Sequence, residues 1–172
     1  MKIIITLIFV FSMFSTYSYA RECGLIGTVD ERISDCATKK MANGTQWTLV
    51  TVTKSGNSVW RDDDSGKIWS DRLNRIYTQY TAAEACVSTK SLDARGNLIS
   101  LAWTLPSNDD FMTAESHGIR NALPHMRYFF WSTSIYPING RLWAGLFCGG
   151  NGSLGYEYRY LYDSVRCVAV VR

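Results

Sequence analysis

The chain has few of the residues that mark catalytic and metal-binding proteins. Its 172 residues include only two histidines and three prolines, and no Cys-x-x-Cys pair or Cys/His cluster has the spacing of a zinc site. No nucleophile motif of the Gly-x-Ser-x-Gly type occurs. The sequence also lacks repeats, low-complexity tracts and long runs of one charge, and its formal net charge is +3. We therefore expect no nucleic-acid partner, no metal and no cofactor.

The amino terminus has the layout of a secretory signal peptide. Lys2 gives a positive start, residues 3–14 form an apolar core, and residues 18–20 (Ser-Tyr-Ala) make a small-x-small cleavage site. The apolar run is shorter than the about 20 residues that a membrane-spanning helix needs, and no comparable run follows it. We expect residues 1–20 to be removed, the protein to be secreted or periplasmic, and no membrane span to remain.

Five cysteines follow the cleavage site, which is an odd number. Export favours disulfides, so one thiol should be unpaired or bonded to another molecule. Cys23 and Cys36 lie in residues 21–46, which we interpret as an N-terminal extension closed by a bond between them; pairing with other cysteines stays open. Three roles are open for Cys148: an intermolecular disulfide that links a dimer, a reactive thiol, or a buried and inert side chain.

The first half of residues 47–172, the expected main domain, predicts strands and a helix. Residues 47–53 are rich in β-branched side chains and favour a strand, and residues 59–61 and 67–69 flank a turn, which is typical of a hairpin. A helix is expected within residues 77–89. Its predicted apolar face consists of Tyr80, Ala83, Cys86 and Val87.

The second half predicts another helix followed by an antiparallel sheet. Ser107 is a good N-cap for a short helix, because two acidic residues follow in its first turn. Asn139-Gly140 is a strong hairpin signal between strands expected over residues 127–135 and 141–148. Two further strands, over residues 156–162 and 164–171, finish the chain. Helices followed by strands predict the α+β fold class, with a mainly antiparallel sheet.

Four blocks in a fixed order give the sequence a resemblance to a known family. They are Trp60-Arg61-Asp62 with Gly66-Lys67-Ile68-Trp69, Trp103-Thr104-Leu105-Pro106-Ser107, Phe130-Trp131-Ser132-Thr133-Ser134 and Val165-Arg166-Cys167-Val168. From about Trp47 to the C-terminus, the chain resembles the family typified by the C-terminal domain of the Lcl collagen-like adhesin, a bacterial family of largely unknown function. The resemblance implies a C-type-lectin-like fold with two short helices and a twisted sheet, a disulfide between Cys86 and Cys167, and a binding role.

Four tyrosines recur at every second position near the C-terminus. They are Tyr156, Tyr158, Tyr160 and Tyr162. On a strand their rings lie on one face, as an aromatic platform for a glycan or protein ligand or as a ladder packed on the core or a neighbouring strand. The candidate ligand-binding residues are Tyr156, Tyr158, Tyr160, Arg159 and Arg141, and the glycine-rich loop over residues 149–155 is the expected place of contact.

The arginines allow a second kind of binding surface. Arg120, Arg127, Arg141, Arg159 and Arg166 either converge on one face that binds sulfated polymers or are ordinary solvated charges. Only the family resemblance suggests the sulfated ligand, because the spacing of these residues does not select it.

The acidic and histidine positions point to structural roles. Asp62-Asp63-Asp64 lacks the ligand spacing of an EF-hand, so an exposed acidic turn is expected in place of a calcium site. His117 and His125 lie in a predicted loop region and are expected at the surface or in packing. Thiol catalysis would need at least a pair of Cys148 with one of these histidines.

These observations lead to a functional hypothesis. We expect a secreted, non-catalytic binding or adhesion module that recognises a glycan, a polyanion or a protein at a cell surface. One alternative is a structural component of the cell envelope. A less favoured one is a thiol-dependent enzyme on a scaffold like that of formylglycine-generating enzyme, although the paired-cysteine copper site of that enzyme has no counterpart here.

Overall fold

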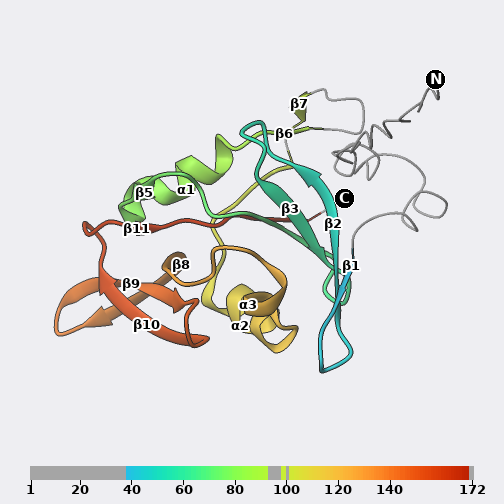
Figure 1. Cartoon of the computed structure of the whole chain (residues 1–172). Coiled ribbons are helices and arrows are strands. Elements are labelled where there is room, and N and C mark those ends of the chain that lie inside the picture. Colours follow the sequence, from blue (N-terminus) through green and yellow to red (C-terminus); the bar gives the residue numbers. More distant parts are fainter. Residues whose placement is uncertain (1–37, 93–97, 100, 171–172) are drawn as a thin grey trace, which may run out of the picture.

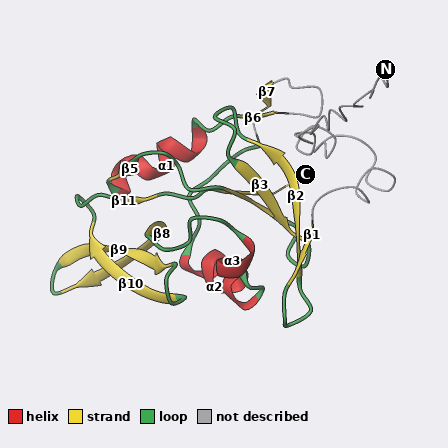
Figure 2. Ribbon diagram, in the orientation of Figure 1, coloured by secondary structure: helices red, strands yellow, loops and turns green. Residues whose placement is uncertain are grey.

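Two five-stranded sheets form the framework of the protein (Figure 1, Figure 2). The computed structural model describes residues 38–92, 98–99 and 101–170. The predictions of a signal peptide over residues 1–20 and of a bond between Cys23 and Cys36 lie outside these residues.

The first sheet has the order β1-β2-β3-β4-β12 and is antiparallel throughout. Its strands are β1 (Thr38–Lys40), β2 (Gln46–Val52), β3 (Ser58–Asp62), β4 (Lys67–Ser70) and β12 (Val168–Val170). The predicted strand over residues 47–53 and the predicted hairpin that follows it are confirmed as β2 and as the β3–β4 pair. Because β1 pairs with β2, the sheet begins inside residues 21–46.

The second sheet has the order β10-β9-β8-β11-β5. Its strands are β5 (Ile76–Tyr77), β8 (Phe129–Ile138), β9 (Arg141–Cys148), β10 (Ser153–Tyr158) and β11 (Asp163–Ser164), and a separate pair consists of β6 (Ser91–Leu92) and β7 (Leu98–Ile99). The β8–β9 turn confirms the hairpin signal of Asn139-Gly140, because φ is +50° and +74° at these residues and a two-residue hairpin turn of type I′ needs positive values at both.

In the part of the chain that the structure describes, three short helices accompany the sheets: α1 (Gln79–Val87), α2 (Asn108–Ser116) and α3 (Ile119–Ala122). The predicted N-cap of α2 is confirmed. Asp110 N donates to Ser107 Oγ at 3.0 Å, and Ser107 N donates to Asp110 Oδ2 at 2.7 Å, which completes a capping box. The α+β class with mainly antiparallel sheets is therefore confirmed, and among the described residues no helix has the length and apolar character needed to cross a membrane.

The predicted apolar face of α1 is confirmed at Cys86, which is buried, and is wrong at Tyr80, Ala83 and Val87, which are exposed. Tyr80 and Val87 are 61% and 64% exposed, whereas the helix buries Gln79, Ala82 and Cys86. Gln79 was not part of the predicted face, because that face was identified from the spacing of apolar residues and Gln79 is polar. It is buried because Arg159 Nε donates to its Oε1 at 2.9 Å and its own amide donates to the Ser132 carbonyl at 3.4 Å.

Both sheets bury residues on both of their faces near the centre of the molecule. Neighbouring residues of one strand enter different hydrophobic clusters: Trp131 and Leu146 join the cluster that contains Cys86 of α1, and Phe130 and Phe147 join the cluster that contains Phe111 of α2. In Figure 1, α1 lies above the β8–β9–β10 sheet and α2 and α3 lie beside it. The sequence is therefore apolar at consecutive positions in these strands and does not alternate.

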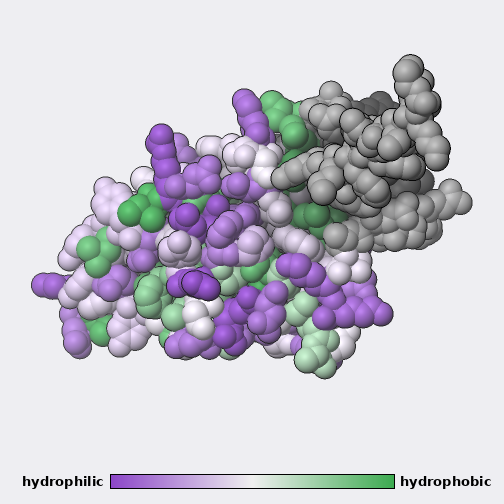
Figure 3. All heavy atoms as spheres, viewed as in Figure 1, coloured by the Kyte–Doolittle hydropathy of each residue, from purple (hydrophilic) through white to green (hydrophobic). Residues whose placement is uncertain are grey.

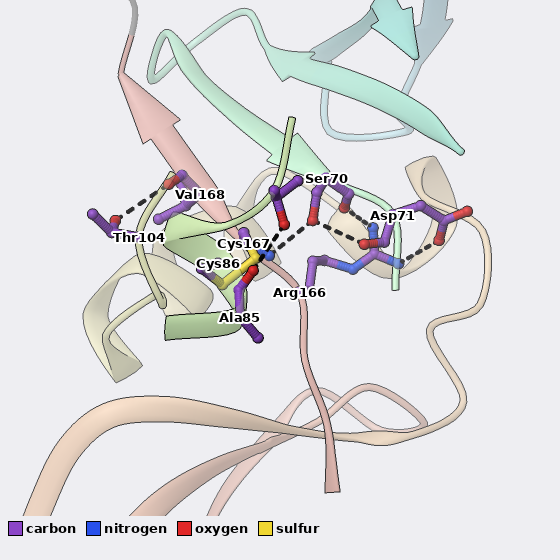
Figure 4. The surroundings of a disulfide bond; sticks show 9 residues. Ser70, Asp71, Ala85, Cys86, Thr104, Arg166, Cys167 and Val168 are labelled. Carbon is purple, nitrogen blue, oxygen red and sulfur yellow. Dashed lines mark hydrogen bonds and ion pairs between the residues drawn. A yellow bond between two sulfur atoms is a disulfide. The ribbon is translucent and has the colours of Figure 1, made fainter. Parts of the chain in front are cut away.

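A disulfide joins α1 to the chain just before β12, as the family resemblance implies. Cys86 and Cys167 are bonded, with Cα atoms 5.4 Å apart and a sequence separation of 81. Figure 4 shows the bond beside Ser70, whose Oγ accepts a hydrogen bond from Cys167 N at 2.9 Å. A loop of this length corresponds to about 4–5 kcal/mol in the chain-entropy model.

Candidate functional site

The β8–β9–β10 sheet carries a cluster of aromatic rings at the end nearest the β8–β9 turn. Trp143 of β9 lies opposite Tyr136 of β8 and Tyr158 of β10 in the strand register. Residues directly across from each other point to the same face of a sheet. The five rings on this face are Tyr136, Trp143, Tyr156, Tyr158 and Tyr160, and we call them the aromatic face.

The rings of the aromatic face contact one another in an unbroken series. Trp143 stacks on Tyr158 with centroids 3.9 Å apart, and Tyr158 stacks on Tyr160 at 5.4 Å. Tyr156 meets the edge of Trp143 at 5.5 Å and an interplanar angle of 83°, and it lies 6.5 Å from Tyr136. These offset and edge-to-face geometries are the favourable ones for aromatic pairs.

The series differs from the predicted straight ladder of four tyrosines. β10 ends at Tyr158, because the chain turns and Leu161 N donates to the Tyr158 carbonyl at 3.0 Å. Tyr160 stacks on Tyr158 from this turn, and Tyr162 makes no ring contact with the aromatic face among the described residues. The sequence alternation continues through residue 162, but the strand does not.

The aromatic face is open to solvent although its rings are in contact. Tyr136, Tyr156 and Tyr160 are 37%, 56% and 62% exposed, and Trp143 and Tyr158 are half-buried beneath them. Figure 3 shows isolated hydrophobic residues among hydrophilic ones over the part of the molecule where β8, β9 and β10 lie in Figure 1. The rings pack on neighbouring strands, as the ladder hypothesis expected, and still present their outer surfaces to water.

The amino end of α2 fixes one border of the aromatic face. Asn108, the first residue of α2, is buried, and its Nδ2 donates to the hydroxyl of Tyr136 at 2.6 Å. Gly145 lies beneath this contact, because an added Cβ there would meet Asn108 Oδ1 and Ser132 Oγ at 2.6 Å. Glycine at this position lets the helix approach the strand closely. No sequence motif marked Asn108 or Gly145, since their roles depend on a contact between distant segments.

The two candidate arginines lie on different sides of the sheet. Arg141 is exposed and two residues before Trp143 on β9, so it projects from the same face as that ring. Arg159 instead contacts α1: its guanidinium lies 4.2 Å from the ring centroid of Tyr80 and donates to Gln79. The structure therefore brings Arg141, but not Arg159, to the aromatic face.

Arg166 contradicts both sequence interpretations of the arginines, because it is fully buried. Its Nη2 donates to Asp71 Oδ1 at 3.3 Å and to the Pro124 carbonyl at 2.6 Å, and its Nη1 donates to the Ser70 carbonyl. Figure 4 shows it pointing away from the disulfide toward Asp71. Desolvation lowers the pKa of Arg166 to about 10, with Asp71 opposing the shift, so the group stays charged at neutral pH. The five arginines therefore do not form one exposed basic face.

The prediction of an exposed acidic turn is wrong for Asp62, which is buried. Its carboxylate accepts hydrogen bonds from Ser65 Oγ at 2.5 Å and Asp64 N at 3.2 Å, and it pairs with His117 Nδ1 at 2.7 Å. Ligand atoms of Asp62, Asp64 and His117 lie within 4.8 Å of one another, which is close enough for a metal ion. Both oxygens of Asp62 are already hydrogen-bonded, so the arrangement is better suited to holding the β3–β4 turn against the end of α2.

Among the described residues, Cys148 makes no hydrogen bond to either histidine. Cys148 is half-buried and takes part in no disulfide with another described residue. The Nδ1 atoms of His117 and His125 face the carboxylates of Asp62 and Asp71, respectively. The predicted packing role thus describes His117. The side chain of His125 is 62% exposed, and its Nδ1 contacts the carboxylate of the buried Asp71.

Comparison of the chain with models of protein families, with curated proteins and with solved structures finds no match.

Proposed function

We propose that the protein is a non-catalytic binding module that recognises a glycan through the aromatic face. The observation that carries this proposal is an exposed series of five mutually contacting rings on a sheet whose other end is covered by a helix. Aromatic side chains combine a rigid apolar ring with a polar group, which suits the mixed apolar and hydroxyl surface of a sugar. Arg141, beside Trp143, adds a hydrogen-bond donor.

The packing of the rings supports a ligand surface over a purely structural role. Each ring is held by its neighbours, so little side-chain entropy is lost when a ligand covers it. Trp143 and Tyr158 form the base of the cluster, and Tyr156 and Tyr160 offer the largest exposed surfaces. A ligand that covers them removes apolar surface from water without any change in the fold.

The finer fold assignment is part of the same proposal. A C-type-lectin-like scaffold of the Lcl C-terminal type fits the bond between Cys86 and Cys167, which links the first helix to the last strand region as that family expects. The disulfide is also consistent with an oxidising compartment. We therefore propose export to the periplasm or the cell exterior, where a surface glycan would be met.

The test is binding of the purified protein to a glycan array, with matched tyrosine variants. Tyr156→Ala and Tyr162→Ala remove similarly exposed rings, 56% and 65% exposed, but only Tyr156 belongs to the aromatic face. We expect Tyr156→Ala to weaken binding to the array hit roughly tenfold or more, as expected for a loss of about 1–3 kcal/mol at a stacking position, and Tyr162→Ala to leave it unchanged.

Two outcomes of the array experiment would contradict the proposal. One is a folded, oxidised sample that binds no glycan; pull-down with protein ligands would then become the next experiment. The other is a glycan hit whose affinity falls equally in the two variants, because this would place the contact away from the aromatic face.

A further inference from the structure

A groove lies at the opposite end of β9 from the aromatic face. The groove, of about 580 Å³, opens between α3, the segment over residues 125–128 and the turn at Gly149-Gly150. Its volume is in the range of small-ligand sites. Gly149 lies six positions after Trp143, and at about 3.3 Å per position this places the groove roughly 20 Å from the aromatic face along the strand.

The walls of the groove are held rigidly. An added Cβ at Gly149 would lie 1.9 Å from the Met126 carbonyl oxygen, and Gly149 N donates to the Tyr128 carbonyl at 2.9 Å. The buried Arg166 anchors the neighbouring segment through its bond to the Pro124 carbonyl. A groove with walls fixed in this way keeps its shape without a ligand.

His125 adds a strained backbone to this wall. Its φ is +58°, in the left-handed region that non-glycine residues seldom adopt. Its Nδ1 faces both oxygens of Asp71 at 3.1 Å, and 62% of its side chain is exposed. The contact with Asp71 engages Nδ1, and His125 is one of the residues that line the groove. Such a conformation persists when the surrounding structure holds it in place, and residues of this kind cluster at ligand-binding sites.

The groove carries an excess of positive charge. Arg120 and Arg127 line it, and the buried, charged Arg166 lies behind its wall. The facing carboxylates are Glu115, which binds Arg120 Nε at 2.7 Å, and Asp71, which is shared by Arg166 and His125. Arg127 is exposed and has no ion pair with any described residue. The guanidinium of Arg127 is therefore available for a ligand.

We propose that this groove binds one oxyanion group, a carboxylate or a sulfate, with Arg127 as the main contact and Arg120 as a flanking donor. A planar guanidinium matches both oxyanions with two parallel hydrogen bonds. Tyr128, which is 46% exposed and already supports Arg72 at 4.5 Å from its ring centroid, gives the groove an apolar wall for the carbon frame that carries the anion. The inference does not depend on the aromatic face.

The test uses sodium sulfate and sodium acetate as probes, at constant ionic strength set with sodium chloride. Backbone amide shifts of the full protein are followed by NMR in the parent and in Arg127→Gln, with Arg75→Gln as control. Arg75 is also exposed, and the two substitutions remove the same charge, but Arg75 lies beside α1 and away from the groove. Arg127 is exposed and makes no ion pair with another described residue, so folding should be kept.

We expect saturable shifts at Gly149 and Gly150 with at least one probe, weakened about tenfold or more in Arg127→Gln and unchanged in Arg75→Gln. The stronger probe identifies the group as sulfate or carboxylate. Tyr156→Ala should leave these shifts intact, so failure of the glycan proposal can be told from failure of this one. Absence of saturable shifts at Gly149-Gly150, or equal weakening in the two arginine variants, would overturn the inference.

Discussion

The two ends of one face of β9 have opposite environments. At one end, Phe147 is fully buried and stacks on Phe111 of α2 with centroids 4.8 Å apart and an interplanar angle of 2°. At the other end, Trp143 projects from the same side of the strand but contacts Tyr156 and Tyr158, with solvent beyond them. Both ends are aromatic, so residue type does not explain why one end is buried and the other exposed. The difference is that α2, which begins at Asn108, packs over only one of the two ends.

The largest expected effect tests this contrast directly. Phe147→Ala should lower the free energy of unfolding by about 3–5 kcal/mol, because it leaves a cavity under Phe111. Trp143→Ala should cost about 1 kcal/mol, since the ring loses aromatic neighbours but not a place in the core. Urea unfolding of both variants at neutral pH measures the difference. Equal losses would mean that the aromatic face is part of the core and not a surface of its own.

The contact between the start of α2 and β9, which lies between the two ends, can be disrupted at Gly145. Gly145→Ala would place a methyl group 2.6 Å from Asn108 Oδ1 and Ser132 Oγ, so we expect a loss of about 1–3 kcal/mol as the start of α2 is pushed from the sheet. Gly155→Ala on β10 is the matched control, because an added Cβ there has nothing within 4 Å. If both variants were equally stable in urea unfolding, the close approach of α2 to β9 would be wrong.

The capping box of Ser107 and Asp110 stabilises the start of α2, the helix that packs over the buried end of β9. Ser107→Ala removes the hydroxyl that accepts from Asp110 N at 3.0 Å, and about 1 kcal/mol of stability should be lost. Amide exchange should also quicken in the first turn of α2 and at the Tyr136 side of the aromatic face, while β3 and β4 stay protected. Unchanged exchange at α2 would show that packing alone holds this end of the helix.

The smallest expected effect concerns Asp163 of β11, a strand of the same sheet that pairs with β8 and β5. Desolvation, and then the charge of Glu157, raise the pKa of Asp163 to about 6. A raised folded-state pKa gives stability that is present below the unfolded value near 3.8 and is lost as the pH rises through about 6. The side chain is only partly buried, so Asp163→Asn should stabilise the protein at pH 7 by no more than about 1 kcal/mol.

The pH dependence provides the check on the Asp163 prediction. The advantage of Asp163→Asn over the parent should shrink between pH 7 and pH 4, because the parent carboxyl becomes protonated over this range. Urea unfolding at four pH values follows it. A stability difference that stays constant with pH would show that the carboxylate of Asp163 is not destabilising in the folded protein.

Local features of the fold could be predicted from the sequence because short-range chemistry decides them. Asn139-Gly140 adopts the two positive φ angles of its turn, and Ser107 caps α2 with a residue three positions away. The strands of the first hairpin follow from β-branched residues around a polar turn. The link between Cys86 and Cys167 was available only through the family resemblance, since five cysteines allow many pairings.

The features that were missed depend on contacts between distant segments. Asp62 looked exposed because its partner His117 lies 55 residues away, and Arg166 looked like a surface charge because Asp71 lies 95 residues away. The sequence likewise did not predict that Gln79 of α1 is buried, because its partner Arg159 lies 80 residues away. For the candidate site, the alternation of the tyrosines predicted that several of their rings share one face of a strand. That Trp143 and Asn108 contact these rings could be seen only from the register of β9 and the position where α2 begins.

Tryptophan fluorescence offers the most direct test of the claim that the uncovered end of the sheet is a ligand surface. Of the six tryptophans, Trp143 is half-buried and the other five are buried, so acrylamide should quench mainly Trp143, and Trp143→Phe should remove that component. Addition of the oligosaccharide selected on the array is predicted to protect Trp143 from acrylamide in the parent protein. Binding of that oligosaccharide with no change in the quenching of Trp143 would contradict the account.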